Sequence, residues 1–435
     1  MKHKTAIAFI FLVALICTTS ADINSDFTAS PRQTHALAWY WLNSSIDNTE
    51  VDNQLTALRD NSKYSGIFPC FASDNWLDNS TFLDRYHHMM DKCDQLGMRV
   101  GMNDDYWYPA GCDKGQMGQY PGACARRITK TERDFTGPTT CRMSIPSGVL
   151  MGCVAMNNAD HGQLTDITAS AGAGTLSWDA PAGSWKVMVF TTSKWGDIVN
   201  YLSADAVKTW MGQTYQKFYD AMPDHFGTTI TSTFSDDVCY LVEEGGWEGQ
   251  DENQPVAWTD EFNTAFQTRY GFSPVKYYPA MWYDIGANTA AARNLLFGFR
   301  NDLFARNFGG TIGSWCAAHN IEASGHYGCT TWTDGWLATA DPIKFFKYMQ
   351  RAGTEGWRGM KAAYSFPGSA AYLYDKPLCV NQNYALVDDF TENDLYQMAM
   401  ESYVRGVNMQ YADGTFYNYS DAFYPPELSW RSPLK

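Results

Sequence analysis

The sequence predicts an α/β fold, a (β/α)8 TIM barrel with a small all-β insertion after the third strand. Three observations carry this prediction: eight short β-like segments, amphipathic helical stretches between most of them, and one region without any helical period. Strands that alternate with helices imply a parallel sheet, and eight such units favour closure into a barrel.

The predicted strands are short apolar runs, several of which end in polar residues. They span residues 36–42, 65–72, 98–104, 229–236, 321–327, 353–357, 378–384 and 407–412. Apolar residues at helical spacing predict helices over residues 49–61, 81–96, 204–222, 260–270, 290–319, 342–351 and 391–405.

One region breaks this alternation. Segments 149–156 and 185–191 are rich in β-forming residues, and proline and glycine turns separate the short strands around them. The predicted organisation is a signal peptide over residues 1–21, a first part of the barrel over 22–125, an inserted β module over 126–195, and the second part of the barrel over 196–435.

The N-terminus has the pattern of a secretory signal peptide. Lys2 and Lys4 precede an apolar run over residues 6–17, and small residues lead up to Ala21, after which cleavage is expected. The alternative of a membrane anchor is disfavoured, because crossing a bilayer needs about 20 apolar residues. We therefore expect a soluble, secreted, extracellular protein.

Cysteine usage agrees with an oxidising compartment. Eleven cysteines are present, and loss of Cys17 with the signal peptide leaves an even number, which predicts disulfide bonds. Cys112 with Cys124, and Cys141 with Cys153, are close enough in sequence to close small loops, although spacing alone leaves the connectivity open. A zinc site is the competing interpretation, but the sequence contains no CxxC pair.

Charge and aromatic content indicate the class of partner. The net charge of −15, which becomes −17 without Lys2 and Lys4, argues against nucleic acid and anionic membranes. Aromatic residues make up 15% of the chain, and their flat faces suit sugar rings, although many of them will pack between helices and barrel. Glycosylation sequons at Asn43, Asn79 and Asn418 fit a secreted surface. No pattern indicates an oligomeric state.

Polar residues stand where several predicted strands end, which is where a barrel of this type binds its substrate. Glycoside hydrolysis needs two carboxyl groups, one that donates a proton and one that attacks or activates water. The candidate catalytic residues are Asp237, Glu355 and Asp413. The candidate substrate-binding residues are Trp41, Asp104, Asp105, Trp107, Asp236, His326, Gln382, Asn408 and Tyr417.

The paired aspartates have other interpretations as well. Asp236 and Asp237 are adjacent on a strand, so only one of them is expected to line the barrel mouth, and the same holds for Asp104 and Asp105. Each of the four could instead cap a helix or bind calcium.

Taken in order, these motifs resemble the barrel glycoside hydrolases around the α-L-rhamnosidases, specifically relatives with a β module inserted after strand three. The resemblance extends from residue 36 to residue 433. It rests on residues 39–43 (WYWLN), 103–111 (NDDYWYPAG), 199–202 (VNYL), 234–237 (FSDD), 324–326 (SGH) and 353–355 (GTE). It implies a glycoside hydrolase, with Asp237 in the position of the general acid.

Four residues differ from the family pattern in charge or in side-chain length. Asp237 stands where relatives have glutamate, Thr330 and Gln382 are neutral where relatives are acidic, and Asp413 replaces a histidine. A carboxamide cannot act as a nucleophile or general base. The second catalytic carboxylate must then come from Glu355, Asp413, Asp105 or Glu322, or be missing.

Two hypotheses follow. The chain is either an active glycosidase or a catalytically degenerate barrel that serves as a secreted carbohydrate-binding protein. The resemblance also implies calcium as a cofactor, but the neutral residues at two acidic positions argue against it. No residue is assigned as a metal ligand, because His326 is isolated among carboxylates and a lone histidine is more often a hydrogen-bonding partner.

Overall fold

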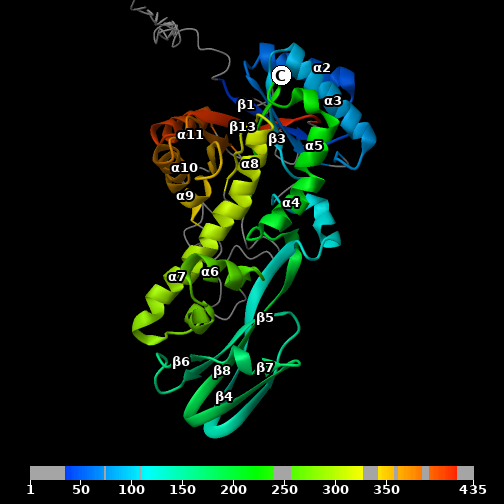
Figure 1. Ribbon diagram of the computed structural model, residues 1–435. Coiled ribbons are helices and arrows are strands. Elements are labelled where there is room, and N and C mark those ends of the chain that lie inside the picture. The colour runs from blue at the N-terminus through cyan, green and yellow to red at the C-terminus, as the bar shows by residue number, and fades with distance from the viewer. Residues whose placement is uncertain are drawn as a thin grey trace, which may run out of the picture.

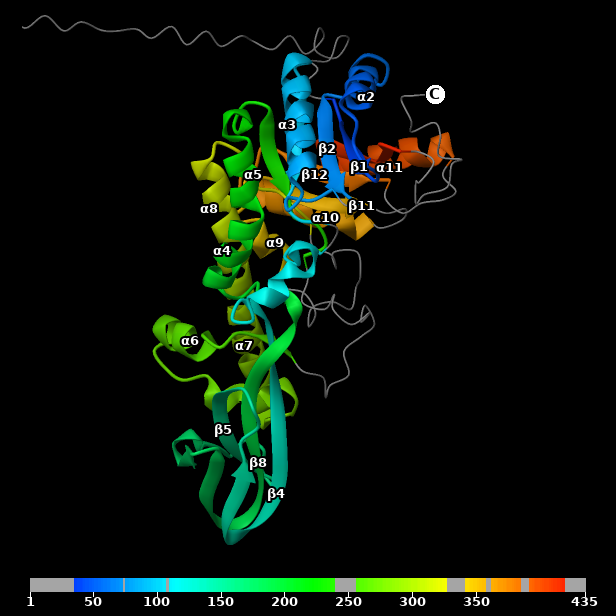
Figure 2. The ribbon, with the colours of Figure 1, turned by 90° about the vertical axis from the view of Figure 1, so that its right-hand side faces the viewer.

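The computed structural model describes residues 35–72, 75–106, 109–238, 256–326, 341–356, 361–384 and 391–418. Figure 1 shows a curled sheet surrounded by helices, and a long antiparallel sheet that projects away from it. The view in Figure 2 shows the same projection from the side, with β4, β5 and β8 forming its length. The predicted mixed α/β class is confirmed.

The curled sheet is parallel throughout and contains seven strands in the order β11-β12-β13-β1-β2-β3-β9. Each of these strands overlaps a predicted one. Their bounds are β1 Leu37–Leu42, β2 Gly66–Phe71, β3 Arg99–Asn103, β9 Ile230–Phe234, β11 Ala352–Gly356, β12 Cys379–Asn383 and β13 Met409–Phe416.

The fifth predicted strand is not a regular strand in the described residues. Glu322 and Gly325 form isolated parallel bridges to β9. On its other side, the segment receives a hydrogen bond of 3.0 Å from the Arg351 amide to the Ala323 carbonyl. The segment therefore lies between β9 and β11, but a single such bond does not extend the ladder, and the observed sheet is a curled half-barrel.

The packing of this segment against β11 leaves no room for a side chain at Gly353. A Cβ atom there would lie 2.2 Å from the Gly325 carbonyl oxygen. We expect Gly353→Ala to lower the free energy of unfolding by about 3 kcal/mol, because backbone atoms must move apart to accept the methyl group. Urea denaturation measures this, with Gly298→Ala in α7 as the control, since a Cβ at Gly298 meets nothing within 4 Å. Equal stability of the two variants would contradict the prediction.

Helices follow most strands. They are α2 Asn48–Asp60, α3 Ser80–Gln95, α4 Ala204–Gln213, α5 Tyr215–Ala221, α6 Phe262–Tyr270, α7 Thr289–Phe304, α8 Gly310–Ala318, α9 Pro342–Phe345, α10 Lys361–Leu373 and α11 Glu392–Val404. A π-helical turn over Ala305–Gly309 joins α7 to α8, so the long helix predicted over residues 290–319 is essentially confirmed. In contrast, α9 is much shorter than predicted, and α10 was not predicted.

Aromatic side chains fill the inside of the curled sheet. The Trp39 ring stacks on Phe68 with centroids 4.6 Å apart, and Tyr411 lies 5.2 Å from Phe68 on the other side. Phe234 meets Trp39 edge-on at 5.4 Å. These four residues come from β1, β2, β13 and β9. They pack together inside the sheet, below the carboxyl ends of the strands.

The second sheet is antiparallel and lies in sequence between β3 and β9, apart from one edge strand. Its order is β10-β4-β8-β5-β6, with β7 paired to β8. The bounds are β4 Cys124–Ser144, β5 Val149–Asn157, β6 Leu164–Asp166, β7 Ala171–Gly172, β8 Thr175–Val199 and β10 Val256–Trp258. Because β10 follows β9, the chain returns to this sheet after passing through the parallel one.

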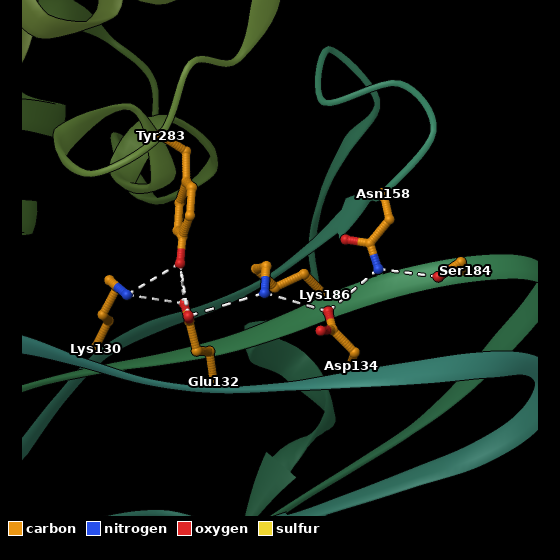
Figure 3. A network of polar contacts seen from close by, with 7 residues as sticks. All are labelled: Lys130, Glu132, Asp134, Asn158, Ser184, Lys186 and Tyr283. Atoms are coloured by element: carbon orange, nitrogen blue, oxygen red, sulfur yellow. Dashed lines mark hydrogen bonds and ion pairs between the residues drawn. The ribbon is translucent and has the colours of Figure 1, made fainter.

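A polar network joins this sheet to the segment before α7 (Figure 3). The Tyr283 hydroxyl donates to the Glu132 carboxylate, with distances of 2.6 and 2.7 Å to the two oxygens. Lys130 donates to the Tyr283 hydroxyl at 3.0 Å, and Lys186 forms ion pairs with Glu132 and Asp134. Two lysines therefore surround the carboxylate that holds the tyrosine, which connects β4 and β8 to the helical part.

The prediction of disulfide bonds is wrong for the described residues, in which all eight cysteines are free thiols. Cys141 lies on β4 and Cys153 on β5, and β8 runs between these two strands. Strands separated by another strand are about 9–10 Å apart, which exceeds the reach of a disulfide. Cys112 and Cys124 are held apart by different partners, since the Cys124 thiol bonds to the Met117 carbonyl at 3.2 Å.

None of the helices in the described parts of the chain has both the length and the apolar composition needed to span a membrane.

Candidate active site at the carboxyl ends of the parallel strands

Asp236, Asp237 and His326 form a compact buried cluster where β9 ends. The His326 Nε2 atom bonds to the Asp236 carboxylate through a short hydrogen bond. The same nitrogen lies 3.7 Å from Asp237 Oδ1 and 3.2 Å from the Asp237 amide nitrogen. His326 is 1% exposed and Asp236 is 8% exposed, so water screens these charges poorly.

The pKa values of His326 and Asp237 are both raised in this cluster. Burial lowers the pKa of His326, but the hydrogen bond to Asp236 and the charges of Asp236, Asp237 and Glu355 together raise it to about 10. Burial raises the pKa of Asp237 to about 7, against the opposing effect of the His326 cation and with a smaller contribution from Asp236. At neutral pH, Asp237 therefore retains a proton in a substantial fraction of molecules, beside an imidazolium.

The expectation that the side chains of the two aspartates point to opposite faces of a strand does not hold. The carboxylates of Asp236 and Asp237 both lie within 4.8 Å of the same His326 nitrogen. The reason is that Asp237 has a φ of 49°, in the left-handed region. Strand alternation therefore ends before it, and such strained backbone is often found at functional sites.

A second group of polar side chains comes from β1, β12 and β13. Asp413 Oδ1 accepts a hydrogen bond of 2.9 Å from the Trp41 indole, and Oδ2 accepts one of 3.4 Å from the Gln382 amide. The Gly414 amide also donates to Asp413. All three side chains are buried, and Gln382 Oε1 has no hydrogen-bond partner in the described part of the chain.

The cluster of Asp236, Asp237 and His326 and the polar group around Asp413 are close enough to influence the same residue, Cys70. Burial raises the pKa of the Cys70 thiol, and the negative charges of Asp413 and Asp236 raise it further, so both carboxylates lie near Cys70. The charge of Glu355 raises the pKa of His326. Glu355 is also paired in register with Gln382 on the neighbouring strand. Cys70 was not among the predicted site residues, although the alternation that turns Phe68 inward on β2 also turns Cys70 inward.

Asp104 is fully buried beneath the mouth. Its Oδ2 atom accepts hydrogen bonds from the Tyr215 hydroxyl, at 2.6 Å, and from the Ser235 hydroxyl. Burial raises the pKa of Asp104 well above its usual range, against the effect of these two bonds. Because Tyr215 belongs to α5, Asp104 joins the carboxyl end of β3 to the helix layer.

Asp105 is also fully buried and organises the loop that follows β3. Its Oδ2 atom accepts hydrogen bonds from the amides of Gly111 at 2.6 Å and Asp113 at 3.0 Å, and from the Trp210 indole at 3.1 Å. Oδ1 accepts a further bond from the Tyr106 amide at 2.7 Å. Burial raises the pKa of Asp105 to about 7, although these amides oppose the shift. Both oxygens of the Asp105 carboxylate therefore accept hydrogen bonds from within the protein.

Other selected residues also lie apart from the cluster. Asn408 precedes β13, at the amino end of the strands, and bonds to the Cys379 amide at 2.8 Å. Glu322 lies at the same end, where it pairs with Arg351. The Tyr417 hydroxyl accepts from the Asp47 amide at the start of α2. Asn408 thus lies at the end of the sheet opposite the cluster, whereas Tyr417 directly follows β13 at its carboxyl end, and Trp107 lies outside the described residues.

Buried acids with raised pKa values make stability depend on pH. Burial raises the pKa of Asp105 and Asp237 to about 7 and that of Asp113 to about 6, above an unfolded value of about 4. A raised folded pKa gives stability that is present below the unfolded pKa and lost as pH rises through the folded one. We therefore expect a lower Tm at pH 7.5 than at pH 5, measured by scanning calorimetry. A Tm that rises over this interval would contradict the prediction.

The cluster at β9 does not fit calcium. Calcium takes six to eight oxygen ligands. The described residues of this cluster supply two carboxylates and a histidine, which are fewer oxygen donors than calcium takes. We therefore assign no part of the chemistry to a calcium ion.

Comparison with known proteins gives one family match in sequence. Residues 152–363, just under half of the chain, match the sequence model of the α-L-rhamnosidase family. This region contains Asp236, Asp237, His326 and Glu355. A comparison with curated proteins gave no match.

Among solved structures, the fold is similar to that of a rhamnosidase from Novosphingobium sp. PP1Y. The TM-score is 0.69 at 12% sequence identity, and the match covers 91% of this chain and 56% of that one. An α-N-acetylgalactosaminidase, NagBb from Bifidobacterium bifidum in a quadruple mutant form, matches at 12% identity over 86% of this chain and 51% of that one, but its TM-score of 0.27 carries no weight. The chain thus spans little more than half the length of the solved rhamnosidase. The chain is thus similar in sequence to the α-L-rhamnosidase family over its central region, and similar in fold to a solved rhamnosidase over most of its length.

Proposed function

We propose that the protein is a secreted glycoside hydrolase that cleaves an α-L-rhamnoside or a related linkage in a plant or microbial polysaccharide or oligosaccharide. We also propose that residues 321–326 complete a (β/α)8 barrel between β9 and β11. The observation that carries the proposal is the carboxyl of Asp237, which is partly exposed, has a pKa raised to about 7 and lies beside the Asp236–His326 pair.

Asp237 acts as the general acid in this proposal. A carboxyl group with a pKa near the working pH retains its proton until the leaving oxygen takes it, and it is still a strong enough acid to release it. Asp236 holds the imidazole ring in place, and the His326 cation stabilises the Asp237 carboxylate that remains after proton transfer. The substrate oxygen would approach at the carboxyl end of β9.

Glu355 is the better candidate for the second carboxylate. Asp413 is 2% exposed and already accepts hydrogen bonds from Trp41, Gln382 and Gly414. Glu355 is only partly buried, and its charge is felt at His326. It can therefore meet a sugar ring or a water molecule while remaining in the same electrostatic environment as Asp237.

A matched pair of variants tests this assignment. We expect Glu355→Gln to lower kcat on an aryl α-L-rhamnoside or another aryl glycoside by about 10²- to 10⁴-fold, because it removes the attacking or activating carboxylate. Asp413→Asn should lower kcat by less than about 10-fold, since its role is to hold Trp41 and Gln382 in place. Chromophore release measures both, and the reverse order of effects would assign the second carboxylate to Asp413.

Gln382 supports one other function. It places a carboxamide, which cannot act as a nucleophile, in the second polar group, so a carbohydrate-binding protein without turnover is the alternative. Calorimetry distinguishes the two: titration of a rhamnose-containing oligosaccharide would give saturable binding with no product in the second case. Efficient hydrolysis by the wild-type protein would exclude the carbohydrate-binding alternative.

A further inference from the structure

A second cluster of titratable side chains lies far from the candidate active site, on the outer surface of α3. His87 and Asp91 belong to this helix, and His225 belongs to the turn before β9. His225 Nε2 is 3.1 Å from Asp91 Oδ1, and His87 Nδ1 is 3.4 Å from Asp91 Oδ2. The two imidazole rings are 5.3 Å apart at an angle of 72°.

Two rigid elements hold these residues. His87 and Asp91 are four residues apart on a helix, so their side chains share one face. The His225 side chain is only 10% exposed, and the turn around it is closed by a hydrogen bond of 3.0 Å from the Thr229 amide to its carbonyl. The Thr229 hydroxyl in turn bonds to Asp94 on α3 at 3.1 Å, which fixes the turn against the helix.

We propose that His87, Asp91 and His225 form a surface site for a divalent transition-metal ion such as Zn²⁺, with water in the remaining position. Two imidazole nitrogens and one carboxylate oxygen are donors that zinc prefers, and calcium would not accept the nitrogens. The donor atoms all lie within 4.8 Å of one another. Tetrahedral zinc, with bonds of about 2.0–2.1 Å, places its donors about 3.3 Å apart. Each imidazole already lies at about this separation from one oxygen of Asp91, His225 from Oδ1 and His87 from Oδ2.

The remaining adjustment is small and falls on an exposed side chain. When one Asp91 oxygen serves as the ligand, the separations that have to shorten do so by at most about 1.5 Å, because all donor atoms lie within 4.8 Å of one another. The His87 side chain is 46% exposed and can rotate to close this difference. The neighbouring cations do not compete for the site, because His88 and Lys92 both pair with Asp52 on α2. A bound ion would connect α3, between β2 and β3, directly to the turn that precedes β9.

The test uses the whole chain after removal of metal with a chelator. Isothermal titration with ZnCl₂ should show one saturable site, and Co²⁺ should give the visible absorption of a low-symmetry site without a thiolate charge-transfer band. His87→Ala should weaken binding by about 100-fold or more, because one of three protein ligands is lost. His88→Ala, on the same helix but facing Asp52, is the matched control and should bind as the wild type does.

Each other outcome overturns the proposal. Wild-type protein that binds neither ion at 100-fold molar excess would exclude the site, as would equal losses in the two variants. A thiolate band with Co²⁺ would place the metal at cysteines instead. Because both histidines are partly exposed, circular dichroism should show that the two variants are folded, and glycosidase activity is not needed for any of these measurements.

Discussion

Asp237→Asn should lower kcat on aryl glycosides by about 10²- to 10⁴-fold while the protein stays folded. The asparagine keeps the shape of the side chain but has no proton to give. In the wild type, activity should fall as pH rises through about 7, because Asp237, whose pKa burial raises to that value, then loses its proton. The residual activity of the variant should lack this limb of the pH profile.

Asp205→Asn is the matched control for this variant. Asp205 lies in the first turn of α4 with its side chain 93% exposed, and the substitution should leave both kcat and the pH profile unchanged. If Asp237→Asn retains the activity and the limb near pH 7, the proton donor is another group. A uniform loss at all pH values, with the limb retained, would instead indicate a positioning role.

Asp105→Ala should have the largest effect on stability. It removes the acceptor for the Gly111, Asp113 and Trp210 donors, all of which are buried around it. Leaving a buried donor unsatisfied costs about 1–3 kcal/mol, so we expect a loss of about 4 kcal/mol or more in the free energy of unfolding. Urea denaturation followed by tryptophan fluorescence measures this loss.

The Asp105→Asn variant tests whether the loss of stability comes from the missing hydrogen-bond acceptor. Asparagine keeps one carbonyl oxygen for these donors but adds an amide that has no acceptor, so an intermediate loss is expected. An alanine variant as stable as the wild type would show that water replaces the carboxylate, and that the loop after β3 does not depend on it.

Much of the fold could be predicted because strands that are buried on both faces have an unmistakable composition. All six residues of Leu37–Leu42 are buried, and the sequence shows them as an unbroken apolar run. The helix α10 could not be predicted in this way, because Pro367 lies within it and a proline usually ends or kinks a helix. Its position between β11 and β12 compensates for that local preference.

The candidate site was less predictable, because it depends on contacts between residues far apart in the chain. Asp104 and Asp105 follow β3 directly, where the barrel pattern expects polar site residues, but Tyr215 and Trp210, more than a hundred residues later, donate hydrogen bonds to them as buried acceptors. Likewise, no spacing rule connects His225 with His87 and Asp91. Disulfides were inferred from an even count of cysteines, and only the strand order shows that Cys141 and Cys153 are too far apart.

The loop after β3 has a mechanical consequence. The Ala110 amide donates a hydrogen bond of 2.7 Å to the Asp236 carbonyl, one peptide unit before Asp237. The same loop leads into β4, which runs the length of the projecting antiparallel sheet. This hydrogen bond therefore connects the loop that leads into the projecting sheet with the peptide between Asp236 and Asp237, so a displacement of that loop would also move the backbone of Asp237.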